Sequence, residues 1–322
     1  MIFKKIKKLA NWLYEIKANT HLIMQELSKD RALKKDIDSL KLQIANLKIE
    51  AIKSKGLVDS LHEVEFKAFS QFGDDGIIQY LIHHVDISSQ TFIEFGVENY
   101  EEANTRLLLL NNNWRGLIID GSEHHINHVK RSDVYWRHDL TAVAQFIDKE
   151  NINHIFKNNR FVGEVGLLSI DIDGNDYWVW QAIDVVNPTI VIVEYNSVLG
   201  DEHAVTIPYK ADFYRTDAHY SNLYWGASLQ ALCMLAEEKG YYFVGCNSAG
   251  NNAYFIRKDK IGDLKPLTAK QGYVESKFRE SRHENYCLSF ISGKDRLKVI
   301  EDCEVYDVIN HRIIKIKDLD KA

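Results

Sequence analysis

Acidic side chains stand at or just beyond the ends of the short apolar runs of this 322-residue chain. Runs of β-type residues are expected as strands at 91–95, 116–119, 134–137, 165–172 and 189–193. The acids at or beside their ends are Glu94, Asp120, Asp139, Asp171, Asp173 and Glu194. In an open parallel sheet, ligands bind outside the carboxyl ends of the strands. We therefore expect these carboxylates to line one crevice, because unpartnered acids at apolar strand ends are costly.

The chemistry of such a crevice selects its ligand. A carboxylate at Asp120 can accept two ribose hydroxyls, and Asp139 suits the amino group of an adenine. The first turn, residues 94–99, holds one glycine and two acids, whereas a pyrophosphate requires a glycine-rich loop. A cationic ligand with an adenosyl group is therefore favoured, which points to S-adenosylmethionine over a nicotinamide or flavin dinucleotide.

Methyl transfer to a hydroxyl needs alignment and a base or a metal. Asp171 and Asp173 are two apart on a predicted strand and face one side, with Glu194 on the adjacent strand end. Three such carboxylates could bind Mg²⁺; alternatively Asp171 positions the cofactor amine and the other two cap turns. His219, in the irregular stretch 197–223 expected to form a substrate lid, is the candidate histidine base, against the alternative of an ordinary surface or core histidine.

The elements that position these residues alternate between strand and helix, which predicts a doubly wound α/β sheet. Helices are expected at 70–85, 104–111, 141–150 and 226–239. A closing hairpin is expected at 241–245 and 253–256, and a smaller one within 304–316 that turns at Asn310-His311.

The first 55 residues have a different composition. They carry 13 Lys/Arg against 6 Asp/Glu and contain neither Gly nor Pro. Apolar residues at steps of four and three run from Ile2 to Leu27 and again from Leu33 to Ala51, with a slip near Asp30. This spacing predicts a coiled-coil stalk that mediates homo-oligomerisation. Two alternatives stay open: first turns lying on an anionic membrane face, or a helix packed on its own body.

Four sequence blocks carry a family resemblance. They are SQFGDDGII at 70–78, FIEFGV at 92–97 followed by NT at 104–105, WRGLIIDGS at 114–122, and LSIDIDGND at 168–176. In order and spacing they resemble the FkbM-like class I methyltransferases over about residues 66–260. The resemblance implies a Rossmann-like seven-stranded sheet and S-adenosylmethionine as cofactor. It also implies that Glu94 and Gly96 flank the methionine part, that Asp120 holds the ribose and Asp139 the adenine, and that Gln71 and Asn104 help to close the pocket.

Composition argues against two other classes of protein, those that bind nucleic acid through a basic surface and those that span a membrane. A net charge of −6 argues against a protein that binds nucleic acid through a basic surface, and the apolar runs are too short to span a bilayer. Four scattered cysteines fit free thiols in a reducing, cytoplasmic setting. We predict a stalk at 1–55, a methyltransferase domain at 56–260 and a C-terminal extension at 261–322.

The predicted activity is O-methylation of a sugar hydroxyl in a bacterial surface polysaccharide or its precursor, the sugar part resting on the resemblance and on the aromatic, polar lid. The alternatives are a catalytically inactive scaffold, a methyltransferase acting on a small molecule or a protein, and a nucleotide-sugar or dinucleotide enzyme.

Overall fold

The computed structural model describes residue 17 and residues 32–321. The chain divides into two units, residues 1–48 and 49–322, which are described separately. Residues 32–53 are helical, as the second apolar series predicts. The first apolar series, from Ile2 to Leu27, lies outside the described residues.

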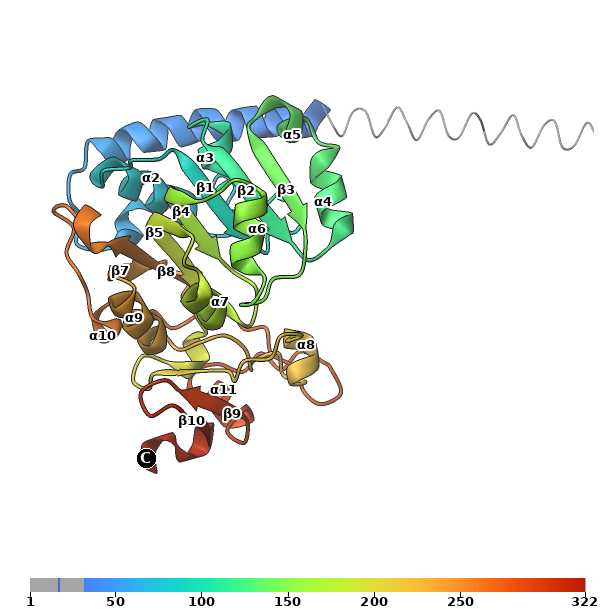
Figure 1. Cartoon of the computed structure of the whole chain (residues 1–322), viewed down its shortest axis with the longest axis vertical. Coiled ribbons are helices and arrows are strands. Elements are labelled where there is room, and N and C mark those ends of the chain that lie inside the picture. Colours follow the sequence, from blue (N-terminus) through green and yellow to red (C-terminus); the bar gives the residue numbers. More distant parts are fainter. Residues whose placement is uncertain (1–16, 18–31, 322) are drawn as a thin grey trace, which may run out of the picture. The chain divides into compact units, whose positions relative to one another are not determined.

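A seven-stranded sheet forms the centre of the larger unit (Figure 1). Its order is β3 (Leu140–Ala144), β2 (Arg115–Asp120), β1 (Thr91–Phe95), β4 (Gly163–Ile170), β5 (Val186–Glu194), β8 (Asn252–Arg257) and β7 (Tyr241–Cys246). Strands β1 to β5 are parallel, and β8 runs antiparallel to both of its neighbours. This is the strand order of the Rossmann-like class I methyltransferase sheet, so the predicted fold is confirmed.

Helices cover both faces of the sheet because the strands are apolar on both sides. Ile93 and Phe95 of β1 belong to one core, while Phe92 belongs to the other. The first core is completed by α6 (Ile152–Asn158), α7 (Asp176–Ala182) and α9 (Leu229–Glu238). The second is completed by α2 (Asp74–His84), α3 (Arg106–Leu110), α4 (Glu123–Lys130) and the 3-10 helix η1 (Leu61–Val64).

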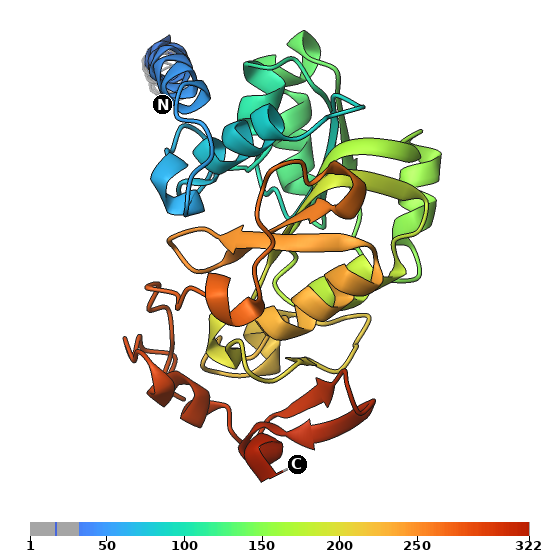
Figure 2. The same ribbon diagram turned by 90° about the vertical axis from the view of Figure 1, so that its left-hand side faces the viewer.

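A second, smaller sheet joins two segments that are far apart in the sequence. It has the order β10 (Arg312–Lys315), β9 (Glu304–Asp307), β6 (Val205–Thr206), and β9 and β10 confirm the predicted C-terminal hairpin. We call residues 195–228 and 273–321 the cap; both views show its β9–β10 hairpin, in red, outside the large sheet (Figures 1 and 2). The cap also holds η2 (Ser197–Leu199), α8 (Arg215–Ala218), α11 (Lys294–Val299) and η4 (Ile316–Lys321), while η3 (Lys258–Lys260) and α10 (Ala269–Gly272) precede its second part.

The prediction for the third strand is wrong. Residues 133–137 form a short helix, α5 (Asp133–Arg137), and the strand begins only at Leu140. The predicted helix at 141–150 is therefore wrong as well, because its first residues belong to β3. Val134, Tyr135 and Trp136 have strand-type side chains, but the segment adopts a single helical turn that packs beside α4 and β3. Within the described part of the chain, every helix is too short or too polar to cross a bilayer.

Candidate functional site

Two cavities open at the carboxyl ends of the parallel strands. One, of about 410 Å³, is lined by Glu194, and the other, of about 610 Å³, by Asp120. We call them the Glu194 cavity and the Asp120 cavity. Both are lined by Gly96, Glu98, Asp171, Asp173, Arg215 and Glu280. They meet between β1 and β4, where the strand order reverses and where ligands of such sheets bind.

The Asp120 cavity joins a carboxylate to an apolar wall. Asp120 ends β2, and its two oxygens accept the backbone N–H groups of Glu98 and Ser122, each at 2.8 Å. Each carboxylate oxygen has two lone pairs, so capacity for further hydroxyl donors remains. Phe146 and Phe213 also line this cavity and offer flat apolar surfaces. The arrangement can hold a ribose at the carboxylate and a planar base against the rings.

Two predicted site residues lie elsewhere. Asp139 precedes β3, at the amino end of that strand, where it is exposed and 3.8 Å from Arg115. The residues that follow β3 at the carboxyl end are Gln145 and Phe146, and they line the Asp120 cavity in its place. His219 lines neither of the two cavities, and its Nδ1 lies 2.7 Å from the hydroxyl of Ser221. Partial burial lowers the pKa of His219.

Glu94 supports the loop before α3. It lines the Glu194 cavity, but its oxygens accept the backbone N–H groups of Asn104 at 2.8 Å and Thr105 at 3.0 Å, and also the Thr105 hydroxyl. Burial raises the pKa of Glu94 to about 7 despite these hydrogen bonds. Asn104 also lines the cavity, and its side chain donates to Ser169 of β4 at 3.1 Å. This carboxylate therefore fixes one wall of the cavity.

Gly96 permits the close approach of β1 and the loop after β4. Its φ is +65°, and a Cβ built on it would lie 1.9 Å from the carbonyl oxygen of Asp171. Its N–H donates to Ile119 of β2 at 3.0 Å. A larger residue would displace the backbone where the two cavities meet.

The SQFGDDGII block forms a clamp. One oxygen of Asp75 accepts the backbone N–H groups of Ala68, Phe69 and Ser70 at 2.7–2.8 Å, together with the Ser70 hydroxyl at 2.8 Å. These bonds hold the turn that brings Gln71 to the wall of the Glu194 cavity. Asp75 thus binds the backbone just before the motif and at its first residue, and it thereby positions the side chain of Gln71.

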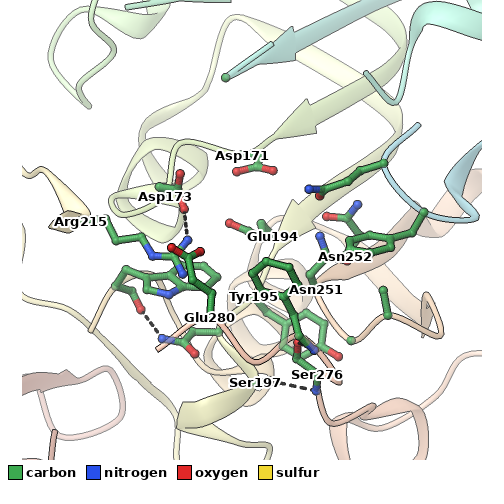
Figure 3. Close-up of a pocket in the computed structure, with 18 of the residues that line it drawn as sticks. Asp171, Asp173, Glu194, Tyr195, Ser197, Arg215, Asn251, Asn252, Ser276 and Glu280 are labelled. Carbon is green, nitrogen blue, oxygen red and sulfur yellow. Dashed lines mark hydrogen bonds and ion pairs between the residues drawn. The ribbon is translucent and has the colours of Figure 1, made fainter. Parts of the chain in front are cut away.

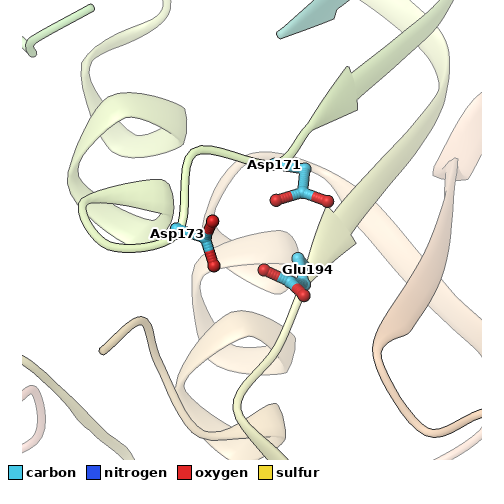
Figure 4. Close-up of side chains that lie close together, drawn as sticks. All are labelled: Asp171, Asp173 and Glu194. Carbon is cyan, nitrogen blue, oxygen red and sulfur yellow. The ribbon is translucent and has the colours of Figure 1, made fainter. Parts of the chain in front are cut away.

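Three carboxylates converge where the cavities meet (Figure 4). Oxygens of Asp171, Asp173 and Glu194 all lie within 4.8 Å of one another. Burial, and then the negative charge of neighbouring carboxylates, raises the pKa of Asp171 and of Glu194 well above their ordinary values. Glu194 Oε2 is buried and has no hydrogen-bond partner among the described residues. The cluster is therefore suited to hold a proton or a cation.

The loop after β4 differs from its prediction. Strand β4 ends at Ile170, so Asp171 and Asp173 lie in a loop, and Asp173 has a φ of +54°. Asp176 shapes this loop by accepting the N–H groups of Ile172 and Gly174, each at 2.9 Å. Burial raises the pKa of Asp176 to about 6. The two acids converge through this turn and not through strand periodicity.

The cap supplies a positive charge to the cluster (Figure 3). Arg215 of α8 donates from Nη1 to Asp173 at 2.5 Å and from Nε to the Asn222 carbonyl at 3.0 Å. Its guanidinium carbon lies 4.7 Å from the centre of the Trp225 ring. Another arginine, Arg296, is buried; it lines the Glu194 cavity and donates to Glu275 at 2.8 Å. Neither arginine was predicted as a site residue, although the irregular stretch 197–223 that contains Arg215 was predicted as a lid.

The remaining wall of the Glu194 cavity combines aromatic rings with amides and hydroxyls. Its residues include Tyr195, Trp225, Phe278, Asn251, Asn252, Ser197 and Ser276. Flat rings beside hydrogen-bonding groups suit a ligand with apolar faces and hydroxyl edges.

No protein-family model matches the chain, and no curated protein matches it. Among solved structures, it is similar to the N-terminal domain of EvdMO1 with SAH bound (10% identity, TM-score 0.38, 66% of this chain and 94% of that chain). It is also similar to an O-methyltransferase from Bacillus cereus in complex with SAH (11% identity, TM-score 0.36, 67% and 89%). A third is the glycopeptide N-methyltransferase MtfA with sinefungin (10%, 0.31, 53% and 81%). Likenesses of this size carry no argument for substrate or mechanism, and the fold rests on the strand order itself.

Proposed function

We propose that this protein is an S-adenosylmethionine-dependent O-methyltransferase. One observation carries the proposal: a cavity suited to an adenosyl group and a cavity suited to a hydroxylated acceptor meet at a cluster of carboxylates. Methyl transfer requires donor and acceptor to meet in line at a positively charged sulfur. Negative charge at that meeting point attracts the sulfonium and can take up the proton of the acceptor.

The roles follow from position. Asp120 binds the ribose, Phe146 and Phe213 pack against the adenine, and Gly96 allows the donor to approach the backbone between β1 and β4. In the reaction, a bond forms between the acceptor oxygen and the methyl carbon while the bond from that carbon to sulfur breaks. The acceptor proton passes to a carboxylate of the cluster. Burial and the neighbouring carboxylates raise the pKa of Asp171 and of Glu194, so each is a stronger base than an ordinary carboxylate.

Magnesium is the second part of the proposal. The three carboxylates are the type of ligand that a hard cation prefers, and the buried oxygen of Glu194, which has no partner among the described residues, is available as a ligand. A bound Mg²⁺ would acidify the acceptor hydroxyl. Arg215 is the competing counter-ion because it is already paired with Asp173. Activity that falls after EDTA treatment and returns with MgCl₂ would support the metal; activity unchanged by EDTA would leave the carboxylates and Arg215 as the complete site.

We propose a sugar hydroxyl of a bacterial surface polysaccharide or its precursor as the acceptor. The rings and amides of the Glu194 cavity and the FkbM-like sequence blocks support this choice. Transfer of a radiolabelled methyl group to a glycan fraction, and not to protein or small-molecule fractions of the same cells, is the expected result. A cytoplasmic setting, with contact to the inner membrane face through the first residues of the sequence, belongs to the same proposal.

Calorimetric titration tests the donor site. We expect the wild type to bind S-adenosylmethionine and Asp120→Ala to lose at least tenfold in affinity. Asp139→Ala removes the same charge at the opposite end of the sheet and should bind as the wild type does. If the wild type does not bind, the inactive-scaffold alternative holds; if it binds NADH instead, the dinucleotide alternative holds. Equal binding by wild type and Asp120→Ala would refute the ribose role alone.

A further inference from the structure

The helix over residues 32–53 carries an apolar stripe that the described residues leave exposed. Its members are spaced four and three apart and are 43–75% exposed; they are Leu33, Ile37, Leu40, Ile44 and Leu47. On the last turns of the helix, Ile49 and Ile52 are each only 6% exposed. The helix therefore has one buried apolar set and a second, separate apolar set that faces solvent. A contiguous exposed stripe of this kind marks an interaction surface.

The residue types along the stripe predict how many helices form the coiled coil. With Ile37 and Ile44 at heptad position a, the leucines at 33, 40 and 47 all fall at position d. Isoleucine at a with leucine at d favours two parallel strands over three or four, because β-branched residues pack well in the a layers of a parallel dimer. The stripe is also narrow, as a coiled-coil seam is, whereas an interfacial membrane helix needs a broad apolar face.

The flanking charges specify the orientation. Position e is lysine in each heptad, at Lys34, Lys41 and Lys48, while position g holds Asp36, Gln43 and Glu50. In a parallel, in-register pair, each g residue faces the e residue of the next heptad of the partner. Asp36 then faces Lys41 of the partner subunit, and Gln43 faces the partner's Lys48. In an antiparallel pair e faces e, so lysine would face lysine.

We propose that a second copy of this chain covers the stripe, in a parallel, in-register, two-stranded coiled coil through residues 33–51. The proposal is independent of the methyltransferase activity. Upstream in the sequence, the apolar spacing from Ile2 to Leu27 offers further heptads for the same pairing.

Light scattering on the full chain tests how many chains form the coiled coil. The expected mass is twice the chain mass of 37.3 kDa. Ile37→Lys with Ile44→Lys should give 37.3 kDa, whereas the matched control Ser39→Lys with Asn46→Lys adds the same charge at exposed positions off the seam and should keep the doubled mass. A wild-type mass of one chain, or of three or more, would overturn the proposal, as would an unchanged mass in the seam variant.

Orientation is tested by oxidative cross-linking and by a charge exchange. Leu33→Cys and Leu47→Cys should each give a disulfide-linked dimer on its own, above the wild-type background from its four native cysteines. Cross-linking only when the two variants are mixed would show an antiparallel pair and overturn the proposal. Lys41→Glu should weaken the dimer by several-fold, and adding Asp36→Lys should restore it. A chain that stays monomeric and co-sediments with phosphatidylglycerol vesicles would assign the stripe to a membrane surface instead.

Discussion

Replacing Arg215 with glutamine should shift the preference of the site toward S-adenosylmethionine, relative to S-adenosylhomocysteine, by about fivefold. The two ligands share the adenosyl and amino-acid groups, but only the first carries a positive charge on sulfur. Arg215 is paired with Asp173 and stands where both cavities meet, so it supplies positive charge to the same carboxylates that we propose to attract the sulfonium. Removing that charge should help the cationic ligand and leave the neutral thioether nearly unaffected.

The magnitude follows from the geometry. Oxygens of the three carboxylates lie within 4.8 Å of one another, and Arg215 Nη1 is 2.5 Å from Asp173. A cation held by the cluster is therefore within about 8 Å of the guanidinium, where two unit charges repel by about 2 kcal/mol at an effective dielectric constant of about 20. Salt and the partial exposure of the arginine reduce this to about 1 kcal/mol. That energy corresponds to about fivefold in the ratio of the two dissociation constants.

The assay is calorimetric titration of wild type and variant with both ligands at two salt concentrations. Arg312→Gln removes an arginine of the cap that pairs with Asp307 and lines neither cavity, and it should leave the ratio unchanged. A shift that shrinks at high salt is expected, because it is electrostatic. If the ratio stays constant while both affinities fall together, Arg215 acts by shape and the charge argument is refuted.

Three further predictions concern the residues that shape the site. Gly96→Ala should cost at least about 3 kcal/mol in urea unfolding, whereas Gly163→Ala, with a positive φ but open space, should cost about 1 kcal/mol. Asp75→Ala should cost about 3–5 kcal/mol because three buried N–H groups lose their acceptor, while Asp86→Ala at an exposed ion pair should stay within about 0.5 kcal/mol. Burial raises the pKa of Glu94 to about 7, so the folded protein binds a proton that the unfolded chain releases above pH 4.5. The free energy of unfolding of the wild type, relative to that of Glu94→Gln, should therefore rise by up to about 3 kcal/mol as the pH falls from 8 toward 4.5. Thermal unfolding at several pH values measures this difference, and the opposite trend would contradict the prediction.

Much of the sheet could be predicted from the sequence. Strands β1, β2, β4 and β5 are buried on both faces, so each appears in the sequence as a nearly continuous run of apolar residues. The β7–β8 hairpin was also predictable, because two β-rich runs flank the turn-rich residues 247–251. Local pattern and tertiary structure agree in these elements.

The third strand could not be predicted because local composition misleads there. The sequence of α5 has the bulky, β-branched and aromatic residues typical of a strand, whereas β3 has the sequence LTAVA, which suits a helix as well as a strand. Pairing of β3 with β2 decides between them, and this is a long-range interaction. The error placed the predicted adenine contact at Asp139, before β3, whereas Gln145 and Phe146 follow β3 at its carboxyl end.

Apart from Asp139, which lies at the amino end of β3, the acids chosen from the sequence fall into two physical groups that only the structure separates. Both oxygens of Glu94 and both of Asp120 accept backbone N–H groups, so these carboxylates shape the walls of the cavities. Asp171, Asp173 and Glu194 instead converge on one another, which is unfavourable unless a positive charge joins them. The sheet supplies this negative charge and the cap supplies Arg215, from a position 42 residues beyond Asp173 in the chain. Substitutions of Glu94 should therefore act mainly on stability, and those of Asp120 on the cavity wall and on ribose binding together. Substitutions of Asp171, Asp173 or Glu194 should act mainly on affinity for a cation.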